Sequence, residues 1–172
     1  MNEKTLEKIC AELSTEWIGR KFGKIFPLSR FRLAIDFRIS DSRYLFIGIE
    51  PSAPQIYFIK RRLRDLEKQS KNLSPFLLYL RKKLSNAVLQ NIQKTDNERI
   101  LRFDFSATDE IGQTENPALI IQLTGRSANL FLLDENDFIL DAMRENSGNG
   151  QQIGQTFSPP FRDSEKKNNE EE

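Results

Sequence analysis

Clustered arginines and lysines are the residues of this chain whose types and spacing could do chemistry. One cluster runs along the chain as KRRLR, from Lys60 to Arg64, and a second follows at Arg81, Lys82 and Lys83. Cations gathered on one surface can neutralise several phosphates of a nucleic acid together. Charged side chains are also mostly solvated surface residues, and composition by itself favours an ordinary exposed charge run. Both interpretations stay open.

The side chains that most enzymes use are scarce in this sequence. It has no histidine and a single cysteine, Cys10. These absences exclude imidazole general bases, Ser–His and Cys–His pairs, zinc sites with imidazole ligands, disulfide frameworks and CxxC motifs. Carboxylates such as Asp104 and Asp109 could pair for acid–base work, but nothing in the sequence brings them together. We therefore expect a binding protein and not an enzyme, with no catalytic residue, metal site or cofactor.

The net charge of +1 hides an uneven distribution along the 172 residues. Residues 1–103 carry 21 Lys and Arg against 11 Asp and Glu, whereas residues 104–172 carry 5 against 14. The first portion is therefore at +10 and the second at −9. Such asymmetry between the two parts of a chain indicates a nucleic-acid or membrane-surface partner.

Nothing in the sequence indicates membrane insertion or secretion. No stretch approaches the roughly 18–20 apolar residues that span a bilayer. The first ten residues, MNEKTLEKIC, are charged, unlike the apolar core of a signal peptide. We expect a cytoplasmic protein with no membrane partner.

Two helices are predicted to flank the rest of the fold. From Thr5 onward, apolar residues recur at three- and four-residue steps and predict one buried helix face: Leu6, Ile9, Cys10, Leu13 and Trp17. Cys10 is then a small buried side chain and not a reactive thiol. A second helix is predicted after Ser74-Pro75, which supplies a capping hydroxyl and a first-turn proline. Its basic residues fall near its end, where cations favour the helix dipole.

Most of the remaining sequence is typical of strands. Residues 30–38 alternate apolar and polar side chains, which predicts a strand with one buried face and arginines on the other. That arginine face is either solvated or a phosphate-binding stripe. Further strands are predicted at 44–49, 55–59, 87–93, 100–105, 118–123, 129–133 and 138–143.

Short strands joined by polar turns predict antiparallel hairpins. The fold class is therefore α+β, a mainly antiparallel β-sandwich or partly closed barrel with two flanking helices. We expect one domain over residues 1–162. The wholly polar residues 163–172 (DSEKKNNEEE) are expected to be a disordered acidic tail or the start of a linker.

Aromatic side chains could add stacking to a nucleic-acid contact. Tyr57 and Tyr79 are the candidates, because single-stranded bases stack on exposed aromatic rings. Tyr57 stands beside Phe58 in a strand pattern, so one of the two is expected to face the core. The Glu98-Arg99 pair at a predicted hairpin tip is either a local surface ion pair or part of a binding site.

The order of several segments resembles a known family. The segments are LEKICAELSTEWIGRKFGKIF, EPSAPQIYF, SPFLLYLRKKL, IQKTDNERILRFDF, ALIIQLTGRSANLFLLDENDFIL and GQTFSPP. Together, from about Leu6 to Pro160, they resemble the NFACT-N domain of the fibronectin-binding-protein-A-like or NFACT family of ribosome-associated quality-control factors. The resemblance implies a fold similar to the N-terminal domain of formamidopyrimidine-DNA glycosylases. Glycosylase chemistry is not implied, because Asn2 and Glu3 stand where those enzymes have their catalytic terminus.

The resemblance also implies which residues bind. The family's Asp-Arg pair, tied to its tRNA function, falls on Glu98 and Arg99, with an acid longer by one methylene. Its Gly-Arg-x-x-Asn turn falls on Gly125, with Arg126 and Asn129. Its basic helix falls on Arg81 and Lys82. The implied site for tRNA is therefore Glu98, Arg99, Arg81, Lys82, Arg126 and Asn129.

By this resemblance, the domain binds tRNA on a stalled large ribosomal subunit that carries a peptidyl-tRNA. Members of the family continue through further domains, so the chain is expected to be either an excised domain or a stand-alone relative. The alternative is a protein-interaction module, which either docks on ribosomal protein or acts as the fibronectin-binding adhesin that the older family name suggests.

Overall fold

The structure, a computed structural model, describes residues 1–160 and contains three α-helices and ten strands within them. Residues 163–172, predicted to be a tail, lie outside the described residues, as do the last two residues of the predicted domain. In chain order, the elements are α1 (Glu3–Glu16), β1 (Ile25–Ser29), β2 (Arg32–Ile35), β3 (Arg43–Gly48), β4 (Gln55–Lys60), α2 (Leu63–Gln69), α3 (Pro75–Leu84), β5 (Val88–Lys94), β6 (Ile100–Thr108), β7 (Thr114–Glu115), β8 (Ala118–Gln122), the 3₁₀ turn η1 (Gly125–Ser127), β9 (Asn129–Leu133) and β10 (Ile139–Ala142).

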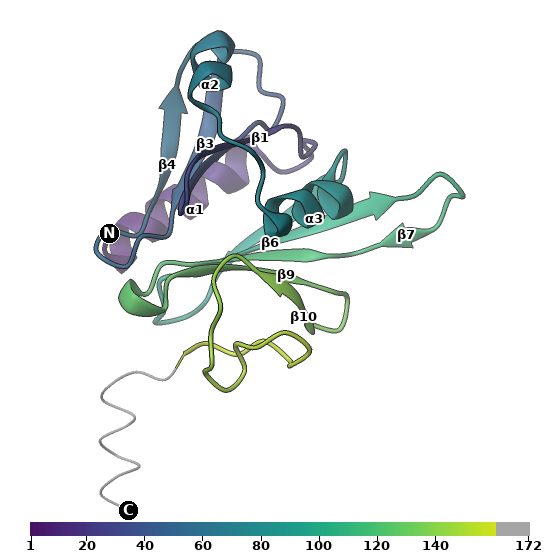
Figure 1. Ribbon diagram of the computed structural model, residues 1–172. Coiled ribbons are helices and arrows are strands. Elements are labelled where there is room, and N and C mark those ends of the chain that lie inside the picture. The colour runs from purple at the N-terminus through teal and green to yellow at the C-terminus, as the bar shows by residue number, and fades with distance from the viewer. Residues whose placement is uncertain (161–172) are drawn as a thin grey trace, which may run out of the picture.

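Two antiparallel sheets make up the β-structure, which confirms the predicted α+β class and is consistent with a sandwich. The first sheet has the order β1-β2-β3-β4, and the second has the order β10-β9-β8-β6-β5, with β7 paired to β6. Figure 1 shows the first sheet standing over one face of the second, with α3 beside it on that same face. Every described strand pair is antiparallel, as short polar turns between strands require.

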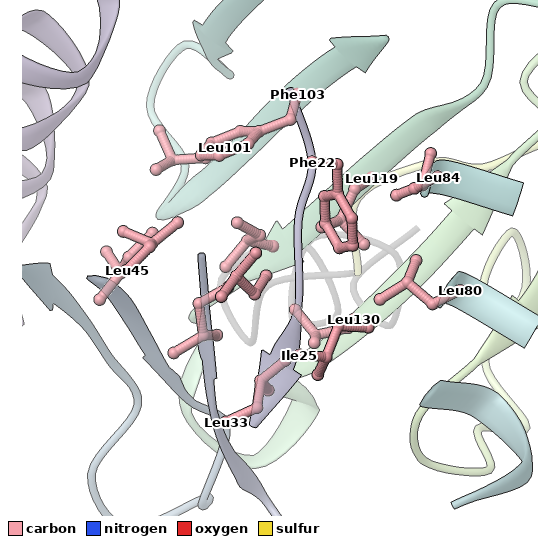
Figure 2. Close-up of a cluster of buried hydrophobic side chains, with 14 of the residues drawn as sticks. Phe22, Ile25, Leu33, Leu45, Leu80, Leu84, Leu101, Phe103, Leu119 and Leu130 are labelled. Atoms are coloured by element: carbon pink, nitrogen blue, oxygen red, sulfur yellow. The ribbon is translucent and has the colours of Figure 1, made fainter. Parts of the chain in front are cut away.

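One hydrophobic core joins the two sheets and their helices. Figure 2 shows how side chains from both sheets meet there, with Leu33 and Leu45 of the first sheet and Leu119 and Leu130 of the second. Aromatic rings cross the same boundary: the Phe37 ring stacks on the Phe105 ring, with centroids 6.4 Å apart. Burial of this shared apolar surface is the main term that holds the two sheets together.

Both predicted helices form, and their caps explain where they begin. The Asn2 side chain accepts a hydrogen bond from the Thr5 amide at 2.8 Å, so α1 begins two residues before the predicted start. The Ser74 hydroxyl accepts from the Leu77 amide at 3.3 Å, and Pro75 occupies the first turn of α3 as predicted.

Three elements were not predicted, and each has weak sequence signals. Strand β1 contains Pro27, which cannot donate to a ladder, and the sheet tolerates it because β1 is an edge strand. Helix α2 buries only Leu66, leaves Leu63 exposed and is otherwise charged or polar, so it has too few apolar residues to form a detectable stripe. Strand β7 is only two residues long. The expectation of two flanking helices is therefore corrected to three.

The segment after β10 has no regular structure, yet it covers the far face of the second sheet. Phe157 lies with its ring centroid 5.2 Å from that of Phe131, and both belong to a second cluster of apolar side chains on that face. Figure 1 shows this segment running along the lower side of β9 and β10. Within residues 1–160, no helix is long and apolar enough to cross a membrane.

Candidate nucleic-acid interface

The turn between β5 and β6 carries Glu98 and Arg99 and is held by a lysine. Lys94 donates from Nζ to the Glu3 carboxylate at 2.7 Å. The same ammonium donates to the backbone carbonyls of Thr95 at 2.9 Å and Glu98 at 3.2 Å. The Lys94 side chain is only 9% exposed, so its charge lies inside the turn. These bonds fix the Glu98-Arg99 turn against the start of α1.

Arg99 lies between the start of α1 and the end of β8. Its guanidinium Nη1 is 3.5 Å from the Met1 carbonyl oxygen, a long hydrogen bond. Its own carbonyl accepts from the Leu123 amide at 2.8 Å, which brings the segment after β8 alongside it. The backbone of Arg99 is therefore fixed, whereas its half-buried side chain is only weakly held.

Arg126 belongs to η1, which a glycine and two hydroxyls shape. Gly125 has φ of +67°, a conformation that favours glycine. The hydroxyls of Thr124 and Ser127 hydrogen-bond each other across the turn. The Arg126 side chain is exposed and makes no ion pair among residues 1–160, so its charge is available to a ligand.

A second arginine supports η1 from behind. Arg144 donates from Nη1 to the carbonyl oxygens of Ala128 at 2.6 Å and Arg126 at 3.3 Å. Its guanidinium also lies 5.4 Å from the ring centroid of Phe31, which belongs to the turn between β1 and β2 of the first sheet. Arg144 therefore positions the backbone of Arg126 and links η1 to the other sheet.

Two buried glutamines join η1 to the segment after β10. Gln122 donates from Nε2 to the Ser127 carbonyl at 2.7 Å and to the Gln151 side-chain oxygen at 2.8 Å. Gln151 returns a bond to the Gln122 side-chain oxygen at 3.3 Å and also accepts from Asn146. Buried polar groups that are fully paired in this way hold one specific arrangement of the chain.

A groove of about 1300 Å³ opens between these three segments. Its lining is polar and contains two cations, two acids, five amides and two hydroxyls: Arg99 and Arg126, Glu3 and Glu98, Asn2, Asn97, Asn146, Asn149 and Gln151, and Thr124 and Ser127. Met1, Gly148 and Pro160 complete it. Guanidinium groups suit phosphates, and side-chain amides can both donate to and accept from sugars and base edges. The groove can therefore hydrogen-bond a polar ligand, and its two guanidinium groups can contact phosphates, without covalent chemistry.

The structure brings three of the six predicted site residues together. Glu98, Arg99 and Arg126 line the groove, although Arg126 lies 27 positions from Arg99 in the chain. Arg81, Lys82 and Asn129 are not among the residues that line it.

Arg81 and Lys82 lie near the opposite end of β6. The next residue of α3, Lys83, forms an ion pair of 3.6 Å with Glu115, which pairs with Ala107. Ala107 is eight residues along the strand from Arg99, a separation of roughly 26 Å at about 3.3 Å per residue. The basic end of α3 therefore lies far from the groove.

Asn129 is buried and bonds to the backbone. It is 1% exposed, its amide nitrogen donates to the Arg144 carbonyl at 2.9 Å, and its oxygen accepts from the Arg144 amide at 2.9 Å. It therefore aligns the segment that carries Arg144 behind η1.

Comparison with known families identifies what this arrangement belongs to. The family described as "NFACT N-terminal and middle domains" matches residues 3–160, nearly the whole described chain. The chain belongs to this family. The resemblance predicted from the sequence is thereby confirmed.

Curated relatives of this NFACT chain are named "Rqc2 homolog RqcH". One from Streptococcus suis is 39% identical over 62 residues, which are 36% of the chain and 11% of the relative. One from Streptococcus pneumoniae is 25% identical over 155 residues, which are 90% of the chain and 27% of the relative. The chain thus spans at most about a quarter of the length of these relatives.

Solved structures show the same fold at low sequence identity. The N-terminal domain of the fibronectin-binding protein PavA from Streptococcus pneumoniae matches with a TM-score of 0.78 and 24% identity, covering 98% of this chain and 68% of that one. A fibrinogen-binding protein from Staphylococcus aureus matches with a TM-score of 0.75 and 20% identity, covering 91% and 55%. The implied likeness to formamidopyrimidine-DNA glycosylases stays a prediction.

Several residues that hold the groove of this NFACT domain in place were not identified in the sequence analysis, and only Gln151 among them lines it. Lys94, Arg144, Gln122 and Gln151 act through contacts between distant parts of the chain, for example Lys94 with Glu3 at 91 positions. No local spacing signals such contacts. The one available signal is a polar residue inside an otherwise apolar run, as Gln122 is in ALIIQ.

The carboxylates considered for catalysis are used within the NFACT fold. Asp104 and Asp137 each accept a hydrogen bond from Arg102, at 2.8 and 2.7 Å. Burial lowers the pKa of Arg102, but these two hydrogen bonds and the negative charges of Asp104 and Asp137 together outweigh it, so that pKa is raised above its ordinary value. Asp109 accepts from the backbone amides of Ile111 and Gln113 in the β6–β7 turn.

Cys10 is a half-buried thiol on α1. Burial raises its pKa, although a hydrogen bond with Ser14 and the charge of Lys94 act in the opposite direction. A raised pKa keeps the thiol protonated at neutral pH and slow to react. No cluster of possible metal ligands occurs among residues 1–160.

Proposed function

We propose that this domain recognises tRNA, as part of a ribosome-associated quality-control factor that acts on stalled large ribosomal subunits with a peptidyl-tRNA. The observation that carries the proposal is the groove, where Arg99 and Arg126 stand among amides and hydroxyls. The family membership of residues 3–160 and the relatives named "Rqc2 homolog RqcH" support it. The proposed protein is cytoplasmic and has no enzymatic activity of its own.

The proposed mechanism combines charge neutralisation with shape recognition. The guanidinium groups of Arg99 and Arg126 contact phosphates, and the amides around them contact sugars and unpaired bases. Glu98 accepts hydrogen bonds from a ribose hydroxyl or a base amino group. Arg81 and Lys82 contact phosphates further along the same RNA, since a folded tRNA is long enough to reach both ends of β6.

Binding of fluorescently labelled tRNA, measured by anisotropy over a series of salt concentrations, tests the proposal. We expect affinity to fall steeply as salt rises, because bound phosphates release counterions. Replacing Arg99→Ala together with Arg126→Ala should weaken binding about a hundredfold or more, since hydrogen bonds to charged groups are each worth about 1.5–3 kcal/mol. Arg81→Ala with Lys82→Ala should weaken it less.

Arg20→Ala with Lys68→Ala is the matched control, because both side chains are exposed and removing them takes away the same charge outside the groove. The control should bind nearly as the unmodified domain does. If the control and the groove variant lost tRNA affinity equally, the loss would come from overall charge and not from the groove. Undetectable tRNA binding at low salt would end the proposal.

Attachment to ribosomes separates this proposal from a protein-docking module. Ribosomal subunits pulled down with the domain should be released when the RNA is digested with nuclease. Retention on ribosomal proteins after digestion would favour the protein-interaction alternative.

A further inference from the structure

The outer face of the first sheet is only half covered. Helix α2 places Leu66, which is 1% exposed, over Phe26, Tyr44 and Ile59. Beyond the helix, Tyr57 stays 38% exposed on the same face. An aromatic side chain this exposed on a sheet is available to a ligand.

Phe46 and Tyr57 form a stacked pair on this uncovered half. They are direct cross-strand partners on β3 and β4, and their ring centroids are 4.6 Å apart with planes inclined by 27°. Gly48 lies beside the Phe46 ring, and a Cβ there would be 3.3 Å from the ring edge. The missing side chain leaves room for Phe46 to lie against the sheet, so Tyr57 rests on a fixed support.

Two arginines border the stacked rings. A depression of about 240 Å³ runs between α2 and the sheet, lined by Tyr57, Phe46, Arg32 and Arg61 among others. Arg32 is positioned by an ion pair of 2.9 Å with Glu50. The Arg61 guanidinium donates only to the carbonyl of Lys60 within residues 1–160, so its charge is not neutralised by an acid there.

The rest of the basic run extends this charge. Residues 60–65 are all exposed, and the KRRLR segment leads directly from β4 into α2 beside the depression. Arg61, the first arginine of this run, lines the depression together with Tyr57, so an exposed aromatic ring and a cation without an acidic partner among residues 1–160 occur on one small surface. Aromatic rings stack on bases of any sequence, and arginines bind the phosphates between them.

We propose that this surface, formed by Tyr57, Phe46, Arg32 and Arg61, binds single-stranded RNA. One base stacks on the outer face of Tyr57, and the adjacent phosphate contacts Arg61 and Arg32. The site lies on the first sheet and shares no residue with the groove that Arg99 and Arg126 line, so it goes beyond the tRNA proposal. A peptide with acidic side chains is the competing occupant, and the experiment below includes it.

Binding of a short labelled oligoadenylate, compared with an abasic oligomer of equal charge, tests the stacking step. We expect Tyr57→Ala to weaken oligoadenylate binding about tenfold, which corresponds to about 1.4 kcal/mol for one stacked base. Tyr57→Phe should restore it, because the ring is kept. The abasic oligomer should bind both variants equally, since it offers charge without a base.

A second measurement addresses the phosphate contact. Arg61→Ala should reduce the slope of log affinity against log salt by about 0.7, the value for one phosphate contact with a single strand. Phe138→Ala is the matched aromatic control, because Phe138 is 43% exposed and lies between β9 and β10, away from the first sheet. It should leave binding unchanged.

Three outcomes would overturn the proposal. Tyr57→Ala could bind oligoadenylate as the unmodified domain does, or weaken the abasic oligomer by the same factor. A polyglutamate peptide could displace the RNA at concentrations where a neutral peptide does not, which would assign the surface to acidic peptides. A domain with Arg99→Ala and Arg126→Ala should keep the dependence on Tyr57, and this result separates the two sites even if the tRNA proposal fails.

Discussion

At the scale of single residues, Arg126 and Asn129 lie three positions apart and serve different purposes. Arg126 is exposed at the groove, whereas Asn129 is buried and bonds to the backbone of Arg144. The three-residue spacing thus places Arg126 on the side of the turn that faces a ligand and Asn129 on the side that faces the interior. Replacing Asn129 would therefore affect ligand binding only indirectly, by shifting η1.

Replacing Asn129→Ala should therefore reduce stability. The change leaves the amide and carbonyl of Arg144 without their partner, and each unsatisfied buried group costs about 1–3 kcal/mol. We expect the free energy of unfolding, measured by urea denaturation, to fall by about 2–4 kcal/mol. Asn149→Ala is the control, because Asn149 is an exposed groove residue and its loss should change stability by less than about 0.5 kcal/mol. Equal stabilities of the two variants would contradict this account of Asn129.

At the scale of elements, the β5–β6 turn depends on a charge that the sequence analysis did not single out. Lys94→Met keeps the length of the side chain but removes three hydrogen bonds, to Glu3, Thr95 and Glu98. We expect faster hydrogen exchange in the turn and a loss of about 1.5–3 kcal/mol in the free energy of unfolding. Lys4→Met, on an exposed position of α1, should change neither. Unchanged exchange in the Lys94 variant would mean that the turn is held by other contacts.

The elements also show what the sequence could predict. The start of α3 follows from Ser74 and Pro75, which act locally and so leave a local signal. Strand β1 was missed because Pro27 is tolerated only at a sheet edge, and edge position depends on the whole sheet. The residues around the groove divide in the same way between local and non-local signals. The Glu98-Arg99 pair stands out in the sequence, but Gln122 and Gln151, which are 29 positions apart, meet only after folding.

At the scale of the whole molecule, the two sheets share one core and should unfold together. Trp17, the single tryptophan, is fully buried with ring centroids 4.9 Å from Phe37 and Phe58, so its fluorescence reports on α1 and the first sheet. Phe105 belongs to the second sheet, yet its ring contacts Phe37 as well. The Phe37 ring thus lies between Phe105 and Trp17, so a substitution at Phe105 should alter the surroundings of Trp17 through that one ring.

Phe105→Leu should lower the stability of both sheets by the same amount. The smaller side chain loses the ring contacts with Phe22 and Phe37 and leaves a gap in the shared core, a cost of about 1–2 kcal/mol. Denaturation followed by Trp17 fluorescence and by far-ultraviolet circular dichroism should give coincident transitions, shifted equally in the variant. Ile111→Ala is the control, since Ile111 is 85% exposed at the tip of the β6–β7 hairpin. If the circular dichroism transition moved while the fluorescence transition stayed, the two sheets would be separate folding units, and the groove and the Tyr57 surface could be lost independently.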